Sequence, residues 1–270
     1  MIVERLKAWQ PETLVAYAST ADLLAKEQLA GRLHIAPQAV FTASEVLTRQ
    51  IRQRIAQAWS QQPLNVYGAT ESATIAAECD QHRGLHLFED LVITEVVDKH
   101  NHSVPPGTPG EKVLLTVLFS RTQPLIRYEM SDQVQVATSP CPCGRPYACL
   151  ETIQGRVEDV LHFPALSGGR VTVHPNVFHD VLDLIPVTGW QIVQRADGLT
   201  VLVSRVGNGF SDTLLIDALR HGLAEQGAIA PLVKIERVAA IPRGAVGKAV
   251  LVKSELHGVS TLRLKNGKGK

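Results

Sequence analysis

Short apolar runs alternate with an amphipathic helix near the start of the chain, and this alternation most restricts the fold. Val40-Phe41 and Leu64–Tyr67 have the length and character of buried strands. Between them Thr48 opens a helix whose apolar stripe consists of Ile51, Ile55, Ala58 and Trp59. An earlier helix is predicted over Ala21–Ala30, with Ser19 and Thr20 as caps. Strands alternating with helices indicate an α/β core.

The pattern changes after Cys79. Leu91–Val97 and Lys112–Phe119 are rich in β-formers, which predicts a β-meander beginning near residue 85. Farther on, Trp190–Gln194 and Leu199–Val203 predict a hairpin, and Leu232–Val238 predicts a strand. Between these, Ser211 caps a helix through Gln226, with an apolar side formed by Leu214, Leu215, Ala218, Leu219 and Leu223. We therefore expect two domains, residues 1–155 and a smaller α+β domain of residues 156–270.

Composition excludes several functional classes. Across 270 residues, 27 basic and 26 acidic side chains leave a net charge of +1, which argues against a nucleic-acid partner. No apolar run reaches the ~18–20 residues of a membrane span. The first residues lack the pattern of a secretion signal, so we expect a cytoplasmic protein without a membrane partner. Four cysteines in such a chain indicate thiols or a metal site.

Two short motifs carry polar groups directly after apolar strands. In Tyr67-Gly68-Ala69-Thr70-Glu71, the glycine permits close approach of a ligand, and the hydroxyl and carboxylate suit phosphate and Mg²⁺. The same residues also fit an ordinary strand-to-helix turn with Thr70 as N-cap. The second motif, 127–132, ends in Asp132, a residue that caps turns as readily as it binds a ribose.

Two further segments are equally ambiguous alone. Gly155-Arg156-Val157-Glu158-Asp159 fits a charged surface turn. The segment 241–248 resembles a phosphate loop, but Pro242 and Ala249 occupy positions that need Gly and Ser or Thr. It is therefore not a Walker A motif.

In this order the four motifs resemble those of adenylate-forming acyl-CoA ligases, and most closely the phenylacetate-CoA ligase family. Cys141-Pro-Cys-Gly-Arg145, just before the third motif, is typical of that branch. The resemblance runs from about Pro11 to Leu256. It implies a partial large adenylate-forming domain, with a βαβ core and a β-meander, followed by a small α+β lid domain. It also implies ATP-dependent activation of a small aromatic or similar carboxylic acid, then transfer to coenzyme A.

The resemblance also implies roles for individual residues. Thr70 would contact phosphate and Glu71 would bind Mg²⁺, while Lys248 would be the lid lysine that stabilises charge on the α-phosphate. The residues that the resemblance would place around AMP or ATP are Ala43, Ser44, Glu45, Tyr67, Gly68, Asp132 and Arg156. Glu158 stands at the hinge, where the family usually has Asp.

The family's Ser/Thr/Gly-rich phosphate loop does not precede Tyr67. We therefore expect an N-terminally truncated ligase that is impaired or inactive alone, with an apolar sheet edge that needs a cover. The alternatives are half of a split ligase, completed by a second chain, and a non-catalytic zinc-stabilised module for nucleotide binding or protein interaction. A homodimer is also left open.

The cysteines suggest a structural zinc site. Cys79, Cys141 and Cys143 supply three thiolates, and His86 supplies an imidazole for a tetrahedral set. The resembled family often has Cys and His at these places. His82 is the competing imidazole, and Cys149 is interpreted as a small buried apolar residue. The alternative is four unrelated reduced cysteines.

Overall fold

A computed structural model describes residues 2–156, 160–242 and 250–256. The chain divides into two compact units, Met1–Glu158 and Asp159–Lys270. The mixed α/β class expected from the sequence is confirmed. The roles of the two parts as core and lid stay predictions. Among the described residues, no helix is long and apolar enough to cross a membrane.

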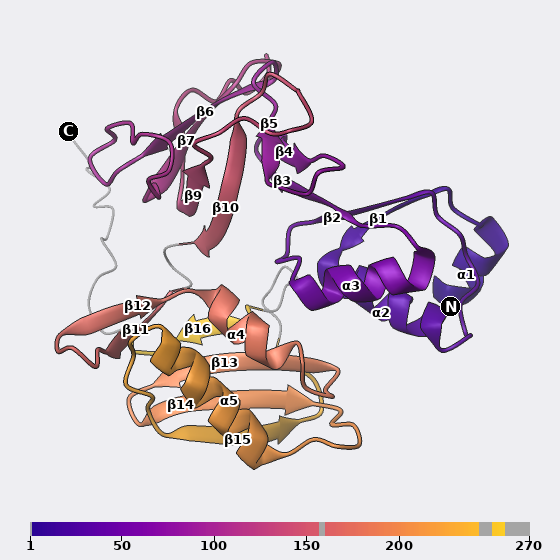
Figure 1. Cartoon of the computed structure of the whole chain (residues 1–270), viewed down its shortest axis with the longest axis vertical. Helices are drawn as coiled ribbons and strands as arrows, with labels where there is room; N and C mark the ends of the chain where they lie inside the picture. The colour runs from indigo at the N-terminus through magenta and orange to yellow at the C-terminus, as the bar shows by residue number, and fades with distance from the viewer. Residues whose placement is uncertain (1, 157–159, 243–249, 257–270) are drawn as a thin grey trace, which may run out of the picture. The chain divides into compact units, whose positions relative to one another are not determined.

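The first unit opens with the predicted alternation of helices and strands (Figure 1). In chain order the elements are α1 (Ile2–Trp9), β1 (Thr13–Tyr17), α2 (Ala18–Leu29), β2 (Ala39–Ala43), α3 (Arg49–Trp59) and β3 (Leu64–Ala69). The three strands pair in parallel. Thr48 caps α3 as predicted, because its hydroxyl accepts a hydrogen bond from the Ile51 N–H. Ile51, Ile55 and Trp59 are buried against one face of these strands.

The start of α2 differs from the prediction. The helix begins at Ala18, and Tyr17 precedes it without a side-chain cap, so Ser19 and Thr20 lie inside the first turn. Glu45, on the segment after β2, accepts a hydrogen bond from the Ser19 N–H at 2.9 Å. A carboxylate from a distant loop thus satisfies an N–H at this helix start, where a negative charge is also favoured.

Antiparallel strands complete the first unit. A seven-stranded sheet has the order β1-β2-β3-β4-β5-β10-β9, which continues from the parallel strands through β4 (Ala73–Glu78), β5 (Leu85–Leu87), β10 (Cys149–Arg156) and β9 (Asp132–Val136). A second sheet of β6 (Val92–Val97), β7 (Lys112–Val117) and β8 (Tyr128–Met130) contains the predicted meander. The apolar sides of both sheets share one core, which includes Ile75, Leu115 and Leu150.

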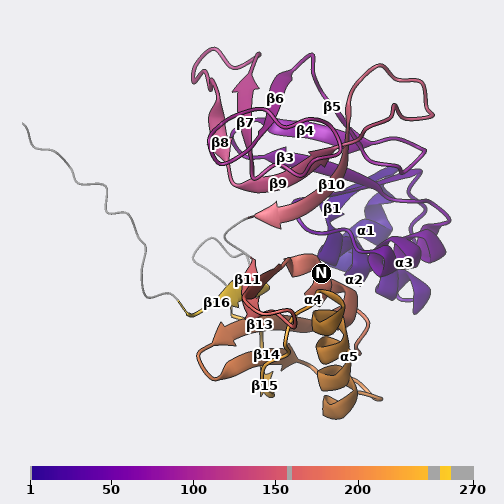
Figure 2. The same cartoon turned by 60° about the vertical axis from the view of Figure 1, so that its left-hand side comes forward.

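The second unit is an α+β module built on the predicted hairpin. Strands β13 (Gly189–Arg195) and β14 (Gly198–Ser204) pair across Ala196-Asp197 and lie at the centre of the order β15-β14-β13-β16. The remaining elements are β11 (Leu161–Pro164), β12 (Arg170–Val173), α4 (Pro175–Leu182), α5 (Asp212–Glu225), β15 (Val233–Val238) and β16 (Val252–Ser254). Both helices pack on one face of the four-stranded sheet (Figures 1 and 2).

Helix α5 begins as predicted, but fewer of its side chains are buried in the core than the sequence predicted. Ser211 accepts a hydrogen bond from the Leu214 N–H, and Leu215, Leu219 and Leu223 are buried. Leu214 and Ala218, which we expected on the apolar side, are exposed. The buried residues are spaced four apart and lie on the side of the helix that faces the sheet. Leu214 and Ala218 each precede one of them in the sequence and therefore lie outside this stripe.

Candidate functional site

The predicted nucleotide-flanking residues gather where parallel strands end. Ala43 ends β2 and pairs with Val66, the residue before Tyr67 and Gly68 on β3. Ser44 follows with a left-handed φ of 65°, which turns the chain toward Glu45. The carboxyl ends of parallel strands in an open sheet are the usual place for ligands. The structure therefore brings together the two segments 43–45 and 67–68.

Residues 67–71 do not form the strand-to-helix turn that we considered. β3 continues to Ala69 and pairs in antiparallel fashion with β4, so Thr70 and Glu71 lie in a hairpin turn. The expectation of a helix after Glu71 is wrong. Residues 73–78 include helix-forming alanines, but Ile75 and Ala76 are fully buried in the sheet, and this tertiary packing outweighs local propensity.

Gly68 is required by this hairpin. A Cβ atom at Gly68 would lie 2.4 Å from the backbone oxygen of Ala73, closer than a real contact allows. The pairing of β3 with β4 also shifts register between Tyr67 and Gly68. The glycine of the motif thus serves the close approach of two backbones.

The first and second motifs meet at a side-chain contact. The Tyr128 hydroxyl donates a hydrogen bond to Glu71 Oε1 at 3.1 Å, across 57 residues of sequence. Tyr128 begins β8, and Asp132 begins β9 four residues later. Sequence reasoning gave Tyr128 no role, although its phenol within the second motif was the available signal.

The second and third motifs meet across a strand pair. Asp132 on β9 is the register partner of Arg156 on β10. The structure thus joins the first motif to the second through the Tyr128–Glu71 hydrogen bond, and the second to the third through the pairing of β9 with β10. Lys248 and Glu158 lie outside the described residues.

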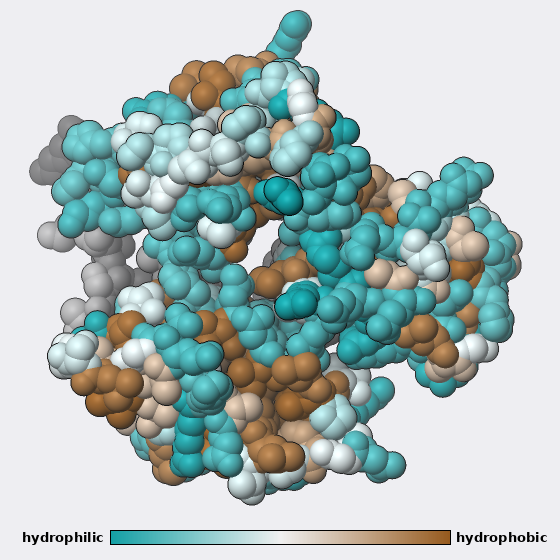
Figure 3. Space-filling model, in the orientation of Figure 1, coloured by the Kyte–Doolittle hydropathy of each residue, from teal (hydrophilic) through white to brown (hydrophobic). Residues whose placement is uncertain are grey.

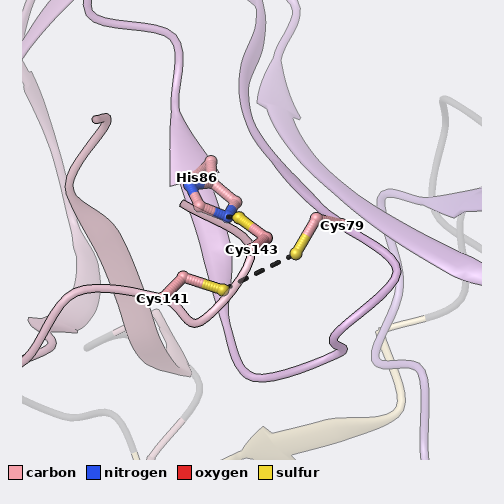
Figure 4. A group of neighbouring side chains, drawn as sticks. All are labelled: Cys79, His86, Cys141 and Cys143. Carbon is pink, nitrogen blue, oxygen red and sulfur yellow. Dashed lines mark hydrogen bonds between the residues drawn. The ribbon is translucent and has the colours of Figure 1, made fainter. Parts of the chain in front are cut away.

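Four potential metal ligands converge at the other end of the same sheet. The ligand atoms of Cys79, His86, Cys141 and Cys143 all lie within 4.8 Å of one another, and Figure 4 shows the side chains pointing toward a common centre. Cys79 follows β4, His86 lies on β5, and the other two come from the connection between β9 and β10. The structure joins all four residues that the sequence predicted as a set.

The spacing of these atoms fits a tetrahedral zinc ion. The Cys79 and Cys141 sulfurs are 3.7 Å apart, and His86 Nε2 lies 3.2 Å from Cys143 Sγ. Two sulfurs bound 2.3 Å from a tetrahedral zinc would be about 3.8 Å apart, and a sulfur and an imidazole nitrogen about 3.6 Å. All four cysteines of the chain are free rather than disulfide-bonded. Donor identity and spacing thus both suit zinc.

The surroundings of the cysteines shift the pKa values of their thiols in different directions. Burial raises the pKa of Cys79, whereas a backbone hydrogen bond from Arg145 lowers the pKa of Cys143. Burial also raises the pKa of Cys149 to about 11, so this thiol stays protonated at neutral pH. Cys143 is therefore the thiol of these three best disposed to ionise.

The structure also decides the positions of His82, the competing imidazole, and of Cys149, the remaining cysteine. His82 Nδ1 lies 3.1 Å from Arg52 Nη1 and 3.3 Å from Glu78 Oε2, in a separate polar network. Cys149 is buried as expected, but its sulfur lies 3.4 Å from His86 Nδ1. The interpretation of Cys149 as a plain apolar residue is incomplete, because it contacts the imidazole of the cluster.

Comparison with known proteins places the chain in a family. No protein-family profile matches it. It is 30% identical to phenylacetate-coenzyme A ligase of Thermus thermophilus over 204 residues, which cover 72% of this chain and 44% of that enzyme. It is also 31% identical to phenylacetate-coenzyme A ligase of Aromatoleum evansii over 102 residues, covering 36% of this chain and 22% of that enzyme. This chain belongs to the phenylacetate-CoA ligase family.

Solved structures of adenylate-forming ligases share the fold. A 2-hydroxyisobutyryl-CoA ligase in complex with its acyl-AMP matches with a TM-score of 0.77 at 22% identity, covering 94% of this chain and 57% of that one. An anthranilate-CoA ligase with bound anthranoyl-AMP matches with a TM-score of 0.70 at 15% identity, covering 92% and 50%. The family member described here thus spans less than two thirds of the length of the relatives it matches.

Proposed function

We propose that this chain forms part of an ATP-dependent, AMP-forming acid–CoA ligase. The observation that carries the proposal is the hydrogen bond between Tyr128 and Glu71, which joins two motifs that are 57 residues apart in sequence. The pairing of Asp132 with Arg156 brings the third motif beside the second. The reaction would convert a carboxylate to an acyl-adenylate and then pass the acyl group to coenzyme A. Matched ligases act on phenylacetate, 2-hydroxyisobutyrate and anthranilate by their names, which supports a small carboxylic acid, aromatic or similar, as substrate.

Each residue of the site has a proposed task. Ala43, Ser44, Glu45 and Tyr67 would flank the adenine, while Asp132 and Arg156 would hold the ribose. Thr70 would contact phosphate. Lys248, outside the described residues, would stabilise charge on the α-phosphate.

Glu71 is proposed to bind magnesium. Mg²⁺, when bound, neutralises phosphate charge, and carboxylate oxygens are ligands that it prefers. Glu71 is exposed in the turn, and Tyr128 donates a hydrogen bond to one of its oxygens. That hydrogen bond orients the carboxylate and leaves the second oxygen for the ion.

Carboxylate-dependent exchange between ATP and pyrophosphate tests the proposal. Exchange is measured with a panel of aromatic and short-chain acids, for the chain alone and for the chain completed by the missing N-terminal part. Wherever exchange occurs, Lys248→Ala should abolish it while nucleotide binding persists. Lys253→Ala is the matched control, because Lys253 contacts Glu255 at the surface of β16 and should not affect exchange. Exchange retained in Lys248→Ala would contradict the role of this lysine.

The second candidate, half of a split ligase, is favoured by an exposed sheet face. Leu14 of β1 packs against the helices, but Val15 and Tyr17 on the opposite face are 69% and 49% exposed. β1 is also an edge strand. Parallel strands are normally covered on both faces. Apart from this face, Figure 3 shows other apolar side chains at the surface of the part of the unit that carries the helices.

A mixing experiment distinguishes the candidates. Exchange that appears only when a second polypeptide carrying the Ser/Thr/Gly-rich loop is added would identify a split enzyme. Nucleotide binding without exchange, alone or mixed, would instead identify a non-catalytic module.

We also propose that Cys79, His86, Cys141 and Cys143 hold one structural zinc ion. The ion would tie the end of β4 and the strand β5 to the β9–β10 connection, which are far apart in sequence. Metal analysis of the purified protein should find about one zinc per chain, given a full Cys₃His set. A metal-free protein of equal stability would contradict this assignment.

A further inference from the structure

Cys149 and His86 are direct cross-strand neighbours. Cys149 begins β10 and is the register partner of His86 on β5. Directly opposed residues of an antiparallel pair project from the same face of the sheet. Both side chains are buried, with exposed fractions of 5% and 3%. The sheet itself therefore fixes this contact.

The imidazole of His86 is held at both nitrogens. Nε2 lies 3.2 Å from Cys143 Sγ, on the side of the metal cluster. Nδ1 lies 3.4 Å from Cys149 Sγ, and Cys149 is not one of the four residues whose ligand atoms converge. A neutral imidazole carries its proton on one nitrogen and a lone pair on the other. A ring that binds a metal through Nε2 must therefore carry its proton on Nδ1, facing Cys149.

We propose that Cys149 is a positioning residue of the metal site, whose sulfur accepts a hydrogen bond from His86 Nδ1–H. This contact selects the tautomer in which Nε2 is free to bind the ion, and it sets the ring orientation. The inference rests on the zinc site proposed above and assigns this fourth cysteine a role outside the ligand set. Partners that orient a metal-bound histidine typically change metal affinity 10–100-fold when they are removed.

Substitutions at Cys149 separate this role from simple packing. Serine keeps an acceptor at the same place, whereas alanine and valine remove it. If Cys149 only fills space, an apolar replacement should be the best tolerated and serine the worst, because a buried hydroxyl needs a partner. A positioning role predicts the reverse order for metal affinity.

The test is zinc affinity, measured in the whole chain by competition with a chromophoric chelator. Cys149→Ala and Cys149→Val should bind zinc roughly 10–100-fold more weakly than the parent, whereas Cys149→Ser should stay within about threefold. Valine accompanies alanine because it fills the site if alanine impairs folding. Cobalt substitution provides a second measurement, since its thiolate charge-transfer absorption reports the number of cysteine ligands. Cys149→Ala should retain the parent intensity, and Cys79→Ser should lose part of it.

Three results would overturn the inference. Zinc affinity that is equal in all three variants, or weakest in Cys149→Ser, would leave Cys149 with a packing role only. A reduced charge-transfer intensity in Cys149→Ala would make Cys149 itself a ligand. A parent protein that binds no zinc would overturn both this inference and the zinc site, whereas the first two results leave the zinc site standing.

Discussion

Gly68 shows how one missing side chain permits a tight hairpin turn. The backbone of β3 passes so close to β4 that the nearest atom to an added Cβ would be a carbonyl oxygen of the main chain. A backbone atom within a paired strand cannot move aside as a flexible side chain can. The positions of Thr70 and Glu71 in the turn therefore depend on this glycine.

Replacing Gly68 with alanine should destabilise the protein by about 1–3 kcal/mol, because the strands must separate to accept the methyl group. Gly222→Ala is the matched control: it lies inside α5, and its Cβ would meet Val181 Cγ2 at an ordinary 3.5 Å. Removing a mid-helix glycine should stabilise the protein by up to about 1 kcal/mol. Urea unfolding measures both. A neutral Gly68→Ala would show that the hairpin adjusts.

Among the elements, α5 depends on a cap and a narrow apolar stripe. The Ser211 hydroxyl accepts a hydrogen bond from the Leu214 N–H at 3.4 Å, and three of the fourteen residues of the helix are fully buried. With Leu214 exposed, the first turn is held by this cap and by Leu215. The start of the helix should therefore be sensitive to the loss of one hydroxyl.

Ser211→Ala should weaken α5 by about 1 kcal/mol, which corresponds to roughly fivefold faster exchange of its protected amide hydrogens. The comparison variant is Thr213→Ala, an exposed position in the same turn, which should leave exchange nearly unchanged. Hydrogen exchange followed by mass spectrometry resolves the helix peptides. Equal effects of the two substitutions would mean that the cap contributes little.

At the scale of the whole molecule, the two units have separate cores and only one contains the cysteine cluster. Among the described residues, the core of the second unit is built from β11 to β16 with α4 and α5 and includes none from the first unit. The cluster joins segments of the first unit that are up to 64 residues apart, from Cys79 to Cys143. Metal loss should therefore affect one unit selectively.

Treatment with a zinc chelator should lower the thermal midpoint of the first unit and leave that of the second unchanged. A contribution of ~2 kcal/mol from the metal would correspond to a shift of roughly 4–8 °C for a unit of this size. Differential scanning calorimetry follows both transitions, and Cys143→Ala should make the protein insensitive to the chelator. A shift of both transitions, or of neither, would contradict this prediction.

Local patterns were sufficient for much of the fold and for proposing the candidate ligands of the cluster, with His82 left as the competing imidazole. The stripe of Ile51, Ile55 and Trp59, the caps Thr48 and Ser211, and the hairpin of residues 190–203 are short-range features, and the structure confirms them. The family resemblance also came from motifs that are local in sequence. Such features are readable because their physical causes lie within a few residues of each other.

Tertiary structure alone decided what depended on distant partners. Burial of Ile75 and Ala76 made a strand of residues that local propensity assigned to a helix, and Glu45 replaced the expected cap of α2. Strand pairing chose His86 over His82 for the cluster and set Cys149 against its imidazole. The contact between Glu71 and Tyr128 likewise joins two motifs that no local rule connects. Each of these outcomes follows from long-range packing, whose free energy exceeds the small preferences of single residues.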